Sequence, residues 1–232
     1  MSQRARRQTA TQQGPADNLD HLGSRVIKYL LEKSHTKYPV KASDIKKYVL
    51  GKHAEHFRQV MVIVKDRLRK IFGYNLVNTT GAQYFITNMI VNEYMKALPR
   101  SDDEAKEQIL LFLVLSFIFM CAENNQNAII VEDELWEFLI NLNIITEDES
   151  QHPYFGNVKS LISDKFVKQL YLIKSKQKET DSVLFEWGPR ANYELDRKAV
   201  LKFVSKIYNC PMENFVKQHK AMKVFERSAL RE

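Results

Sequence analysis

The apolar residues of this chain are spaced so that the same order of elements is predicted twice. In the first half, helical spacing predicts helices over about 17–34, 44–50 and 53–72. Two strands are predicted next, over 74–77 and 83–87, on either side of a polar turn. Three helices followed by a β-hairpin are typical of a winged-helix domain.

The second half repeats this order and then adds two closing helices. The predicted elements are helices over 102–124, 131–142 and 157–169, strands over 170–175 and 183–187, and closing helices over 190–208 and 212–225. The expected fold class is therefore mainly α with small β-hairpin wings, arranged as two tandem winged-helix domains. The low content of glycine and proline, 7 and 6 residues, agrees with a chain dominated by helices.

The domain boundaries follow from where these patterns begin and end. We expect a first winged-helix domain over 17–100 and a second over 101–226. Residues 1–16 have no large apolar residue after Met1 and contain three arginines, so they are expected to form a disordered basic tail. Residues 227–232 are expected to form a second, short tail.

One segment of the second half is unusually apolar. Residues 109–122 are apolar except for Ser116, and Glu107 and Glu123 bound the run. A membrane-spanning helix needs about 20 apolar residues, so this run is too short to span and predicts a buried core helix. We therefore expect no membrane partner.

The net charge of +7 is distributed unevenly along the chain. Residues 1–100 contain 18 Lys and Arg against 7 Asp and Glu, whereas residues 101–150 contain one Lys against 12 acidic residues. Residues 151–232 are basic again, with 16 against 9. Two basic lobes favour a polyanionic partner for at least one of them, although two solvated surfaces account for the charge equally well.

The sequence contains no recognisable catalytic or cofactor-binding pattern. Cys121 and Cys210 are too few for a four-thiolate zinc site, and no two glycines lie close enough for a phosphate-binding loop. His53 and His56 are three residues apart, but no third ligand follows at zinc-like spacing. We expect a protein that is not an enzyme and has no metal, cofactor or small-molecule substrate.

Four strings in the second half stand in one order and together carry a family resemblance. They are ELWEFL at 134–139, HPYFG at 152–156, FVKQLYL at 166–172 and FEWGPRA at 185–191. Together they closely resemble the MAGE homology domain of the melanoma-antigen family, whose fold is two tandem winged helices. The residues that carry the resemblance include Trp136, His152, Pro153, Phe155, Gly156, Trp187, Gly188, Pro189 and Arg190.

The resemblance also implies a function. Because little sequence lies outside the homology domain, the chain is similar to the single-copy type of the family, which is a non-SMC element of the DNA-repair SMC complex. That likeness implies an adaptor that binds and stimulates a RING-type E3 ubiquitin ligase subunit, binds a kleisin subunit and contacts DNA in the nucleus.

Two alternatives remain open on the sequence. One is an E3-ligase adaptor, in the cytoplasm or the nucleus, that has no DNA role. The other is a winged-helix transcription regulator, which would leave a sequence-specific footprint on DNA. The sequence contains no cluster of Asn, Gln and Arg that would indicate base reading, so sequence-independent DNA binding is expected.

Leu30 and Leu31 are the predicted ligase-binding pair. On the predicted first helix, Leu31 lies about 100° from Leu30 and therefore at the edge of the apolar face. Adjacent leucines are common in core helices, and by themselves these two would indicate packing. The ligase-binding di-leucine of the family falls on these two positions, so the resemblance favours partner binding.

The basic candidates for DNA contact fall into two sets. Arg58, Lys65 and Arg69 lie within about 40° of one another on the predicted third helix, which is the helix most able to enter a major groove. The second set lies in the second lobe, toward which the family resemblance points, and comprises Lys159, Lys165, Lys168, Lys174 and Lys176, with Lys178 beside them. The sequence leaves open which lobe contacts DNA and which pocket holds the kleisin.

Overall fold

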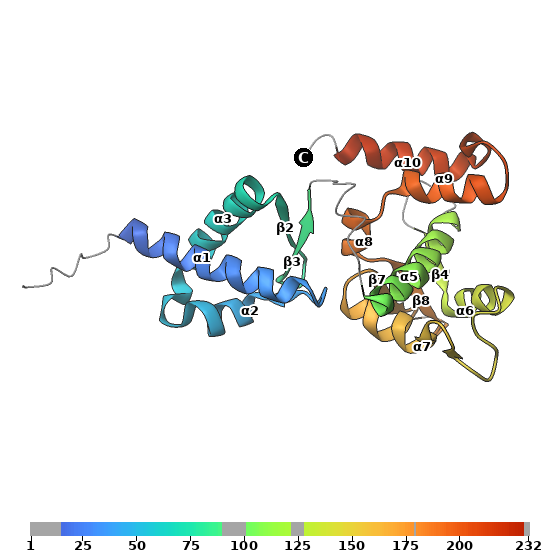
Figure 1. Cartoon of the computed structure of the whole chain (residues 1–232), viewed down its shortest axis with the longest axis horizontal. Coiled ribbons are helices and arrows are strands. Elements are labelled where there is room, and N and C mark those ends of the chain that lie inside the picture. Colours follow the sequence, from blue (N-terminus) through green and yellow to red (C-terminus); the bar gives the residue numbers. More distant parts are fainter. Residues whose placement is uncertain (1–14, 90–100, 122–127, 179, 230–232) are drawn as a thin grey trace, which may run out of the picture. The chain divides into compact units, whose positions relative to one another are not determined.

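A computed structural model of the chain describes residues 15–89, 101–121, 128–178 and 180–229. The chain forms two compact units, Met1–Ile90 and Val91–Glu232, and each has a hydrophobic core of its own (Figure 1). Most of the predicted tail over 1–16 lies outside the described residues, as does the predicted end of the first domain near residue 100.

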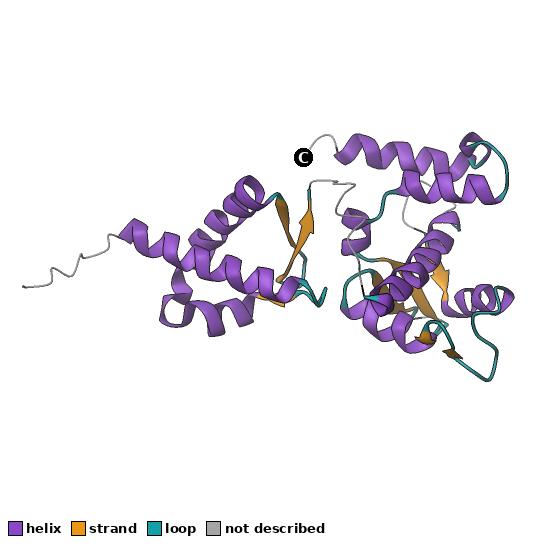
Figure 2. Cartoon of the chain, in the orientation of Figure 1, coloured by secondary structure: helices purple, strands orange, loops and turns teal. Residues whose placement is uncertain are grey.

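The first unit consists of helices followed by a small antiparallel sheet (Figure 2). Its elements are α1 (Pro15–Ser34), β1 (Val40–Lys41), α2 (Ala42–Asp44), η1 (Ile45–Leu50), η2 (Gly51–His56), α3 (Phe57–Arg67), η3 (Leu68–Phe72), β2 (Tyr74–Asn78) and β3 (Gln83–Asn88). The sheet order is β1-β3-β2, with Val40 opposite Tyr84 and Leu76 opposite Ile86. Because β1 has only two residues, no alternating pattern was available to predict it.

The third predicted helix differs from expectation at its C-terminal end. Val60, Val64 and Leu68 are fully buried, as the helical stripe predicts. Ile71 and Phe72 continue that stripe in the sequence, but their side chains are 68% and 45% exposed. Both residues lie in η3, a π-helical turn at the end of the third helix, to which the α-helical period does not extend.

The second unit has more elements and a second three-stranded sheet, ordered β4-β8-β7. The elements are α5 (Asp102–Met120), β4 (Ile129–Val131), α6 (Glu132–Asn141), β5 (Gln151–His152), β6 (Gly156–Asn157), α7 (Val158–Ser160), η4 (Leu161–Phe166), β7 (Leu172–Lys176), β8 (Val183–Trp187), α8 (Pro189–Glu194), α9 (Arg197–Ile207), η5 (Met212–Asn214) and α10 (Val216–Ala229). The strands β4, β5 and β6 have two or three residues each and were not predicted.

The helix predicted over 190–208 is two helices. Leu195 has an extended backbone conformation between α8 and α9, and the side chain of Asp196 accepts a hydrogen bond from the backbone N–H of Lys198 at 2.9 Å. An aspartate that caps a new helix favours a break over continuation of the preceding helix. Apolar spacing alone did not detect this cap.

The apolar run of the second half forms α5, and most of its side chains are buried. Leu110, Val114 and Ile118 are fully buried in the core of the second unit, whereas Ile109 is 46% exposed. Among the described helices, none is long and apolar enough to cross a membrane.

Close backbone approach fixes the fold around Gly188. Its N–H donates to the carbonyl of Tyr171 at 2.8 Å, and the N–H of Arg190 donates to the carbonyl of Leu170 at 3.0 Å. A Cβ placed on Gly188 would overlap the carbonyl oxygen of Leu170. Only glycine therefore allows the chain at the end of β8 to pass this close to the segment that leads into β7.

We expect Gly188→Ala to lower the free energy of unfolding of the second unit by at least about 3 kcal/mol, because the backbone must move to admit the methyl group. Denaturant unfolding followed by tryptophan fluorescence measures this, since Trp187 is buried beside the site. The unmodified chain is the reference, and equal stability of Gly188→Ala and the unmodified chain would contradict the packing argument.

Candidate functional site

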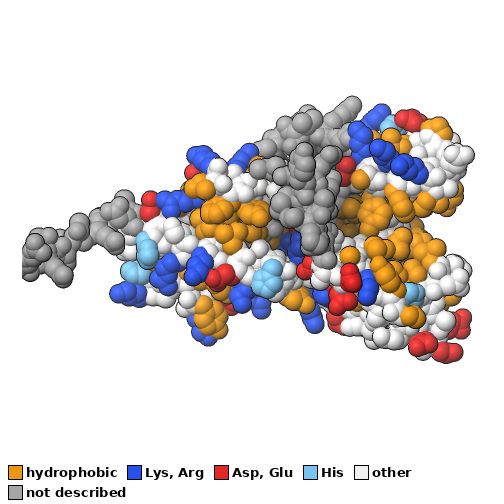
Figure 3. Space-filling view, in the orientation of Figure 1, with side chains coloured by type: hydrophobic (Ala, Val, Ile, Leu, Met, Phe, Trp, Pro, Cys, Tyr) orange, Lys and Arg blue, Asp and Glu red, His pale blue; other side chains and the backbone are white. Residues whose placement is uncertain are grey.

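A groove lies on the surface of the first unit between α1 and the end of the third helix. Its volume is about 420 Å³. Figure 3 shows hydrophobic side chains gathered over α1 and α3 in this unit. The groove is lined by Ser24, Ile27, Lys28, Leu31, Glu32, Arg67, Ile71 and Phe72. Ile71 and Phe72 form part of its apolar wall, since their side chains lie outside the core.

The two predicted ligase-binding leucines have different positions. Leu30 is 2% exposed and packs in the core of the first unit, so its side chain is not available to a partner. Leu31 is half-buried and lines the groove. The role of Leu30 is therefore packing, and Leu31 is the member of the pair that a partner can reach.

Charged residues fix the width of the groove. Arg67 donates from Nη1 to the backbone carbonyl of Asp20 and to Ser24 Oγ, and its Nη2 lies 2.7 Å from Asp20 Oδ2. This guanidinium therefore joins α3 to α1 at the groove. Lys28 and Glu32 form a longer ion pair of 3.8 Å on α1. The rim thus contains both signs of charge around an apolar centre.

A basic face lies on α3 and η3, formed by Arg58, Lys65 and Arg69. All three side chains are exposed, and none forms an ion pair with a residue that the structure describes. Val62 lies among them and is 70% exposed. The acidic residue of this helix, Asp66, is paired with Lys70 at 2.8 Å.

Most lysines of the predicted second-lobe set are engaged within the second unit. Lys165 pairs with Glu107, Lys174 with Glu132 at 3.3 Å, and Lys176 with Asp181 at 3.2 Å. The ammonium of Lys159 lies 5.7 Å from the centre of the Trp136 ring. Lys168 and Lys178 are exposed and have no ion pair within the described residues.

An apolar surface in the second unit was not singled out from the sequence. We call it the α5–α9 face: the rings of Phe112 on α5 and Phe203 on α9 pack edge to face at 5.1 Å, and Ile109 and Ile207 lie one turn away on their helices, 46% and 63% exposed. Figure 3 shows hydrophobic side chains gathered on this side of the unit. In the sequence, the four-residue spacing of Phe203 and Ile207 indicates only that both lie on one face of the closing helix predicted over 190–208.

The motif residues of the second half build structure. His152 Nδ1 accepts the N–H groups of Tyr154 and Phe155 at 3.0 and 3.2 Å, which closes the loop between β5 and β6. Gly156 ends this loop with a φ of 76°, in the left-handed region. Trp136 packs against Phe185, and the loop residue Pro153 is exposed.

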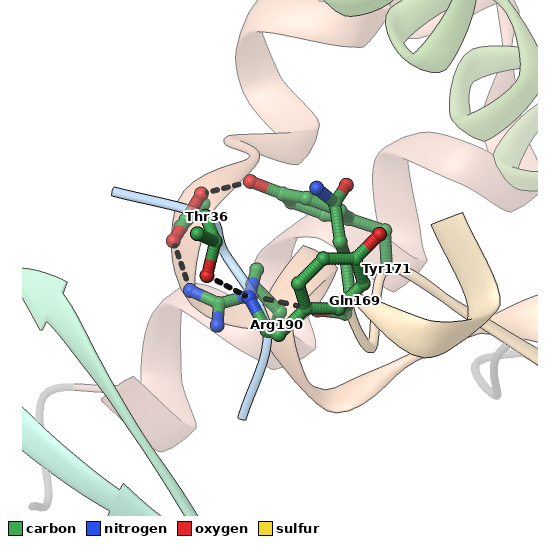
Figure 4. Close-up of polar contacts among 6 residues, drawn as sticks. Thr36, Gln169, Tyr171 and Arg190 are labelled. Carbon is green, nitrogen blue, oxygen red and sulfur yellow. Dashed lines mark hydrogen bonds and ion pairs between the residues drawn. The ribbon is translucent and has the colours of Figure 1, made fainter. Parts of the chain in front are cut away.

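A buried polar network surrounds Arg190, which is 3% exposed (Figure 4). Its Nε donates to the carbonyl of Gln169 at 2.8 Å, and its Nη1 lies 3.0 Å from Glu194 Oε1. The hydroxyl of Tyr171 donates to the second oxygen of Glu194. Pro189 is the first residue of α8, the helix that carries both Arg190 and Glu194.

Trp187 anchors the same strand in the core. Its indole N–H donates to the carbonyl of Leu115 at 2.8 Å, and the guanidinium of Arg197 lies 4.5 Å from its ring centre. Burial lowers the pKa of Arg197 to about 10, so the guanidinium stays protonated at neutral pH. The motif residues Trp187 and Arg190 therefore contribute packing and hydrogen bonds that stabilise the second unit.

The described residues contain no cluster that could hold a metal ion. No group of three or more His, Cys, Asp and Glu side chains lies together within them. His53 and His56 stack with ring centres 6.4 Å apart. Cys121, expected in the core, is an exposed residue directly after α5. Partial burial of its thiol and, to a smaller extent, the charge of Glu134 raise the pKa of this thiol. A raised pKa lowers the thiolate fraction and hence the reactivity.

The two units, each with helices and a small antiparallel sheet, define a protein of the tandem winged-helix class. A model of the MAGE homology domain matches residues 26–84 and 78–198. The chain belongs to the MAGE homology domain family.

Two individual proteins are similar to the chain over most of its length. The chain is 35% identical to the mouse protein "Non-structural maintenance of chromosomes element 3 homolog" over 190 residues, covering 80% of this chain and 66% of that protein. It is 35% identical to the human protein of that name over 210 residues, covering 88% and 67%. The chain thus spans about two thirds of these relatives.

A solved structure agrees with these relatives. A chain of the "Nse1-Nse3-Nse4 complex" superposes with a TM-score of 0.76 at 29% identity, covering 90% of this chain and all of that one. This likeness confirms the predicted fold class of two tandem winged helices. The roles assigned to the predicted site residues stay predictions.

We expect His152→Ala to lower the stability of the second unit by about 1 kcal/mol or more, because two backbone N–H groups lose their acceptor. His152→Asn should recover much of the loss, since an Asn oxygen accepts the N–H two residues on in an Asx turn. Denaturant unfolding compares the variants. Equal stability of the alanine variant and the unmodified chain would show that the loop does not depend on this acceptor.

Proposed function

We propose that this chain is the MAGE subunit of a DNA-repair SMC complex. In that role it binds and stimulates a RING-type E3 ubiquitin ligase subunit, and it bridges this ligase to a kleisin subunit and DNA in the nucleus. The proposal is supported by the identity to the mouse and human relatives and by the likeness to a chain of the Nse1-Nse3-Nse4 complex. The observation that carries it is the apolar groove of the first unit.

The groove suits insertion of an apolar segment of the ligase subunit. Leu31, Ile71 and Phe72 supply an apolar wall, and exposure of two such large side chains in a small unit is costly unless a partner covers them. The mixed charges of Lys28, Glu32 and Arg67 form a polar rim around this centre. An apolar centre with a polar rim is the usual anatomy of a protein interface.

We expect Ile71→Asp to weaken binding of the RING subunit by about tenfold or more, because it places a charge in an apolar docking site. Val62→Asp is the matched control: the same change on the same helix, at 70% exposure against 68%, and outside the groove. Titration calorimetry with the purified RING subunit measures both. Stimulation of ubiquitin transfer should fall in parallel with affinity.

Unchanged affinity for Ile71→Asp would place the ligase elsewhere on the chain. Leu31→Ala is the second variant, since Leu31 is half-buried and lines the groove. Leu30→Ala is unsuitable as a binding test, because removal of its buried side chain is expected to cost about 2–5 kcal/mol of stability. Circular dichroism of each variant distinguishes lost binding from lost folding.

For the kleisin, the α5–α9 face is the surface we assign. Phe203 and Ile207 are exposed on α9, and Lys202 and Lys206 beside them are exposed without an ion pair in the described part of the unit. An amphipathic helix with acidic residues along one edge would bury its apolar side on this face and neutralise these lysines.

We expect Ile207→Glu to reduce kleisin binding by about tenfold or more, through a charge in the apolar face and repulsion of an acidic edge. Ile173→Glu on β7 is the control, since Ile173 is also exposed but lies outside the α5–α9 face. Co-purification with the kleisin at several salt concentrations measures the effect. Equal loss in both variants would contradict the assignment.

DNA contact is the third element of the proposed function, and we expect it to be sequence-independent. The basic residues in both units support this contact. If they bind phosphates, the affinity for DNA should fall steeply as the salt concentration rises. Complete absence of DNA binding at low salt would favour the alternative, an E3-ligase adaptor with no DNA role.

A further inference from the structure

One face of the third helix of the first unit carries three cations with no ion-pair partner among the described residues. Arg58, Lys65 and Arg69 are exposed on α3 and η3, and none has an ion-pair partner within the described residues. Asp66 on the same helix is neutralised by Lys70 at 2.8 Å. Three like charges on one face repel one another, so an anion that binds them all relieves that repulsion.

The corresponding helix of the second unit does not offer such a face. Among the lysines of α7 and η4, Lys165 is paired with Glu107, and Lys159 lies over the ring of Trp136. Asp164 is exposed on the same segment. Of the wing lysines on β7, Lys174 and Lys176 are also paired, as described above. A phosphate would have to displace these partners before it could bind.

The spacing on α3 suits a duplex. Eleven residues separate Arg58 from Arg69, which is about 16 Å along the helix axis. The major groove of DNA is about 12 Å wide, so cations at the two ends of this row reach phosphates on either side of it. Val62 lies in the middle of the row, 70% exposed, and an apolar side chain there adds no base-specific hydrogen bond.

We infer that the first unit binds duplex DNA through this face of α3, with Arg58, Lys65 and Arg69 contacting phosphates and no base read directly. The inference rests on the proposed DNA contact and names the surface that makes it. In a winged-helix domain the third helix is the element able to enter a major groove. The wing of this unit, around the turn of Asn78 to Ala82, contains no basic residue, so the helix is the contacting element.

The test is fluorescence anisotropy of the full chain with a short labelled duplex of mixed sequence, over a range of salt concentrations. The α3 variant is Arg58→Ala/Lys65→Ala/Arg69→Ala, and the matched control removes the same charge from the second unit, Lys168→Ala/Lys174→Ala/Lys176→Ala. We expect the α3 variant to lose about tenfold or more in affinity and its log–log salt slope to fall by about 2.7, for three lost contacts. The second-unit control variant should lose less affinity for DNA.

A pair of single substitutions on one helix sharpens the test. Val62→Asp places a negative charge among the three cations and should weaken DNA binding while it leaves RING binding intact. Ile71→Asp should do the reverse, because Ile71 lies in the groove at a similar exposure. RING binding by the triple α3 variant shows that the first unit remains folded.

Each other outcome overturns a specific part of the argument. If the unmodified chain binds no DNA at low salt, the DNA element of the proposed function fails, and this inference fails with it. If the chain binds DNA and the α3 variant binds equally well, the DNA role stands and the α3 site is wrong. A larger loss in the second-unit variant would assign the contact to its wing, and equal losses would show dependence on net charge alone.

Discussion

The second unit depends on the close approach of two backbone segments at Gly188. Because this residue lacks a Cβ, the chain at the end of β8 lies against the carbonyls of Leu170 and Tyr171, which accept hydrogen bonds from the backbone N–H groups of Arg190 and Gly188. That approach positions Trp187 under α5 and turns the chain into α8, where Arg190 reaches the carbonyl of Gln169. The sheet, the apolar helix and the closing helices are therefore positioned by one contact that only glycine permits.

In the first unit, two lining residues of the groove, Ile71 and Phe72, lie where the third helix departs from regular α-helical geometry. Helical spacing predicted the core face of the third helix correctly as far as Leu68 and then failed for Ile71 and Phe72. Both residues lie in the π-helical turn of η3, and no local sequence signal distinguishes such a turn from an α-helix. The residues that sequence reasoning assigned to the core are those that form the apolar wall of the groove. Leu30 shows the opposite case, since a residue expected at a partner surface is buried.

The number of basic residues in each lobe could be predicted from the sequence, but which of them form ion pairs could not. The basic composition of both lobes follows from the sequence alone, and so does the helical row of Arg58, Lys65 and Arg69. The partners of Lys165 and Lys174 lie 58 and 42 residues away along the chain, so only the fold shows that these cations are engaged. The main elements and the fold class were predictable because they repeat a helical or alternating period. Short strands, the Asp196 cap and the long-range ion pairs have no such period.

The helix formed by α3 and η3 presents three different surfaces around its circumference. Val60, Val64 and Leu68 face the core, Arg67, Ile71 and Phe72 line the groove, and the basic row occupies the remaining side. Few positions along it are therefore neutral to substitution, since a change that spares the core still alters one of the two outer surfaces. Such a helix should accumulate substitutions slowly between related organisms, and those it does accept should occur together with compensating changes in whichever molecule faces the altered side.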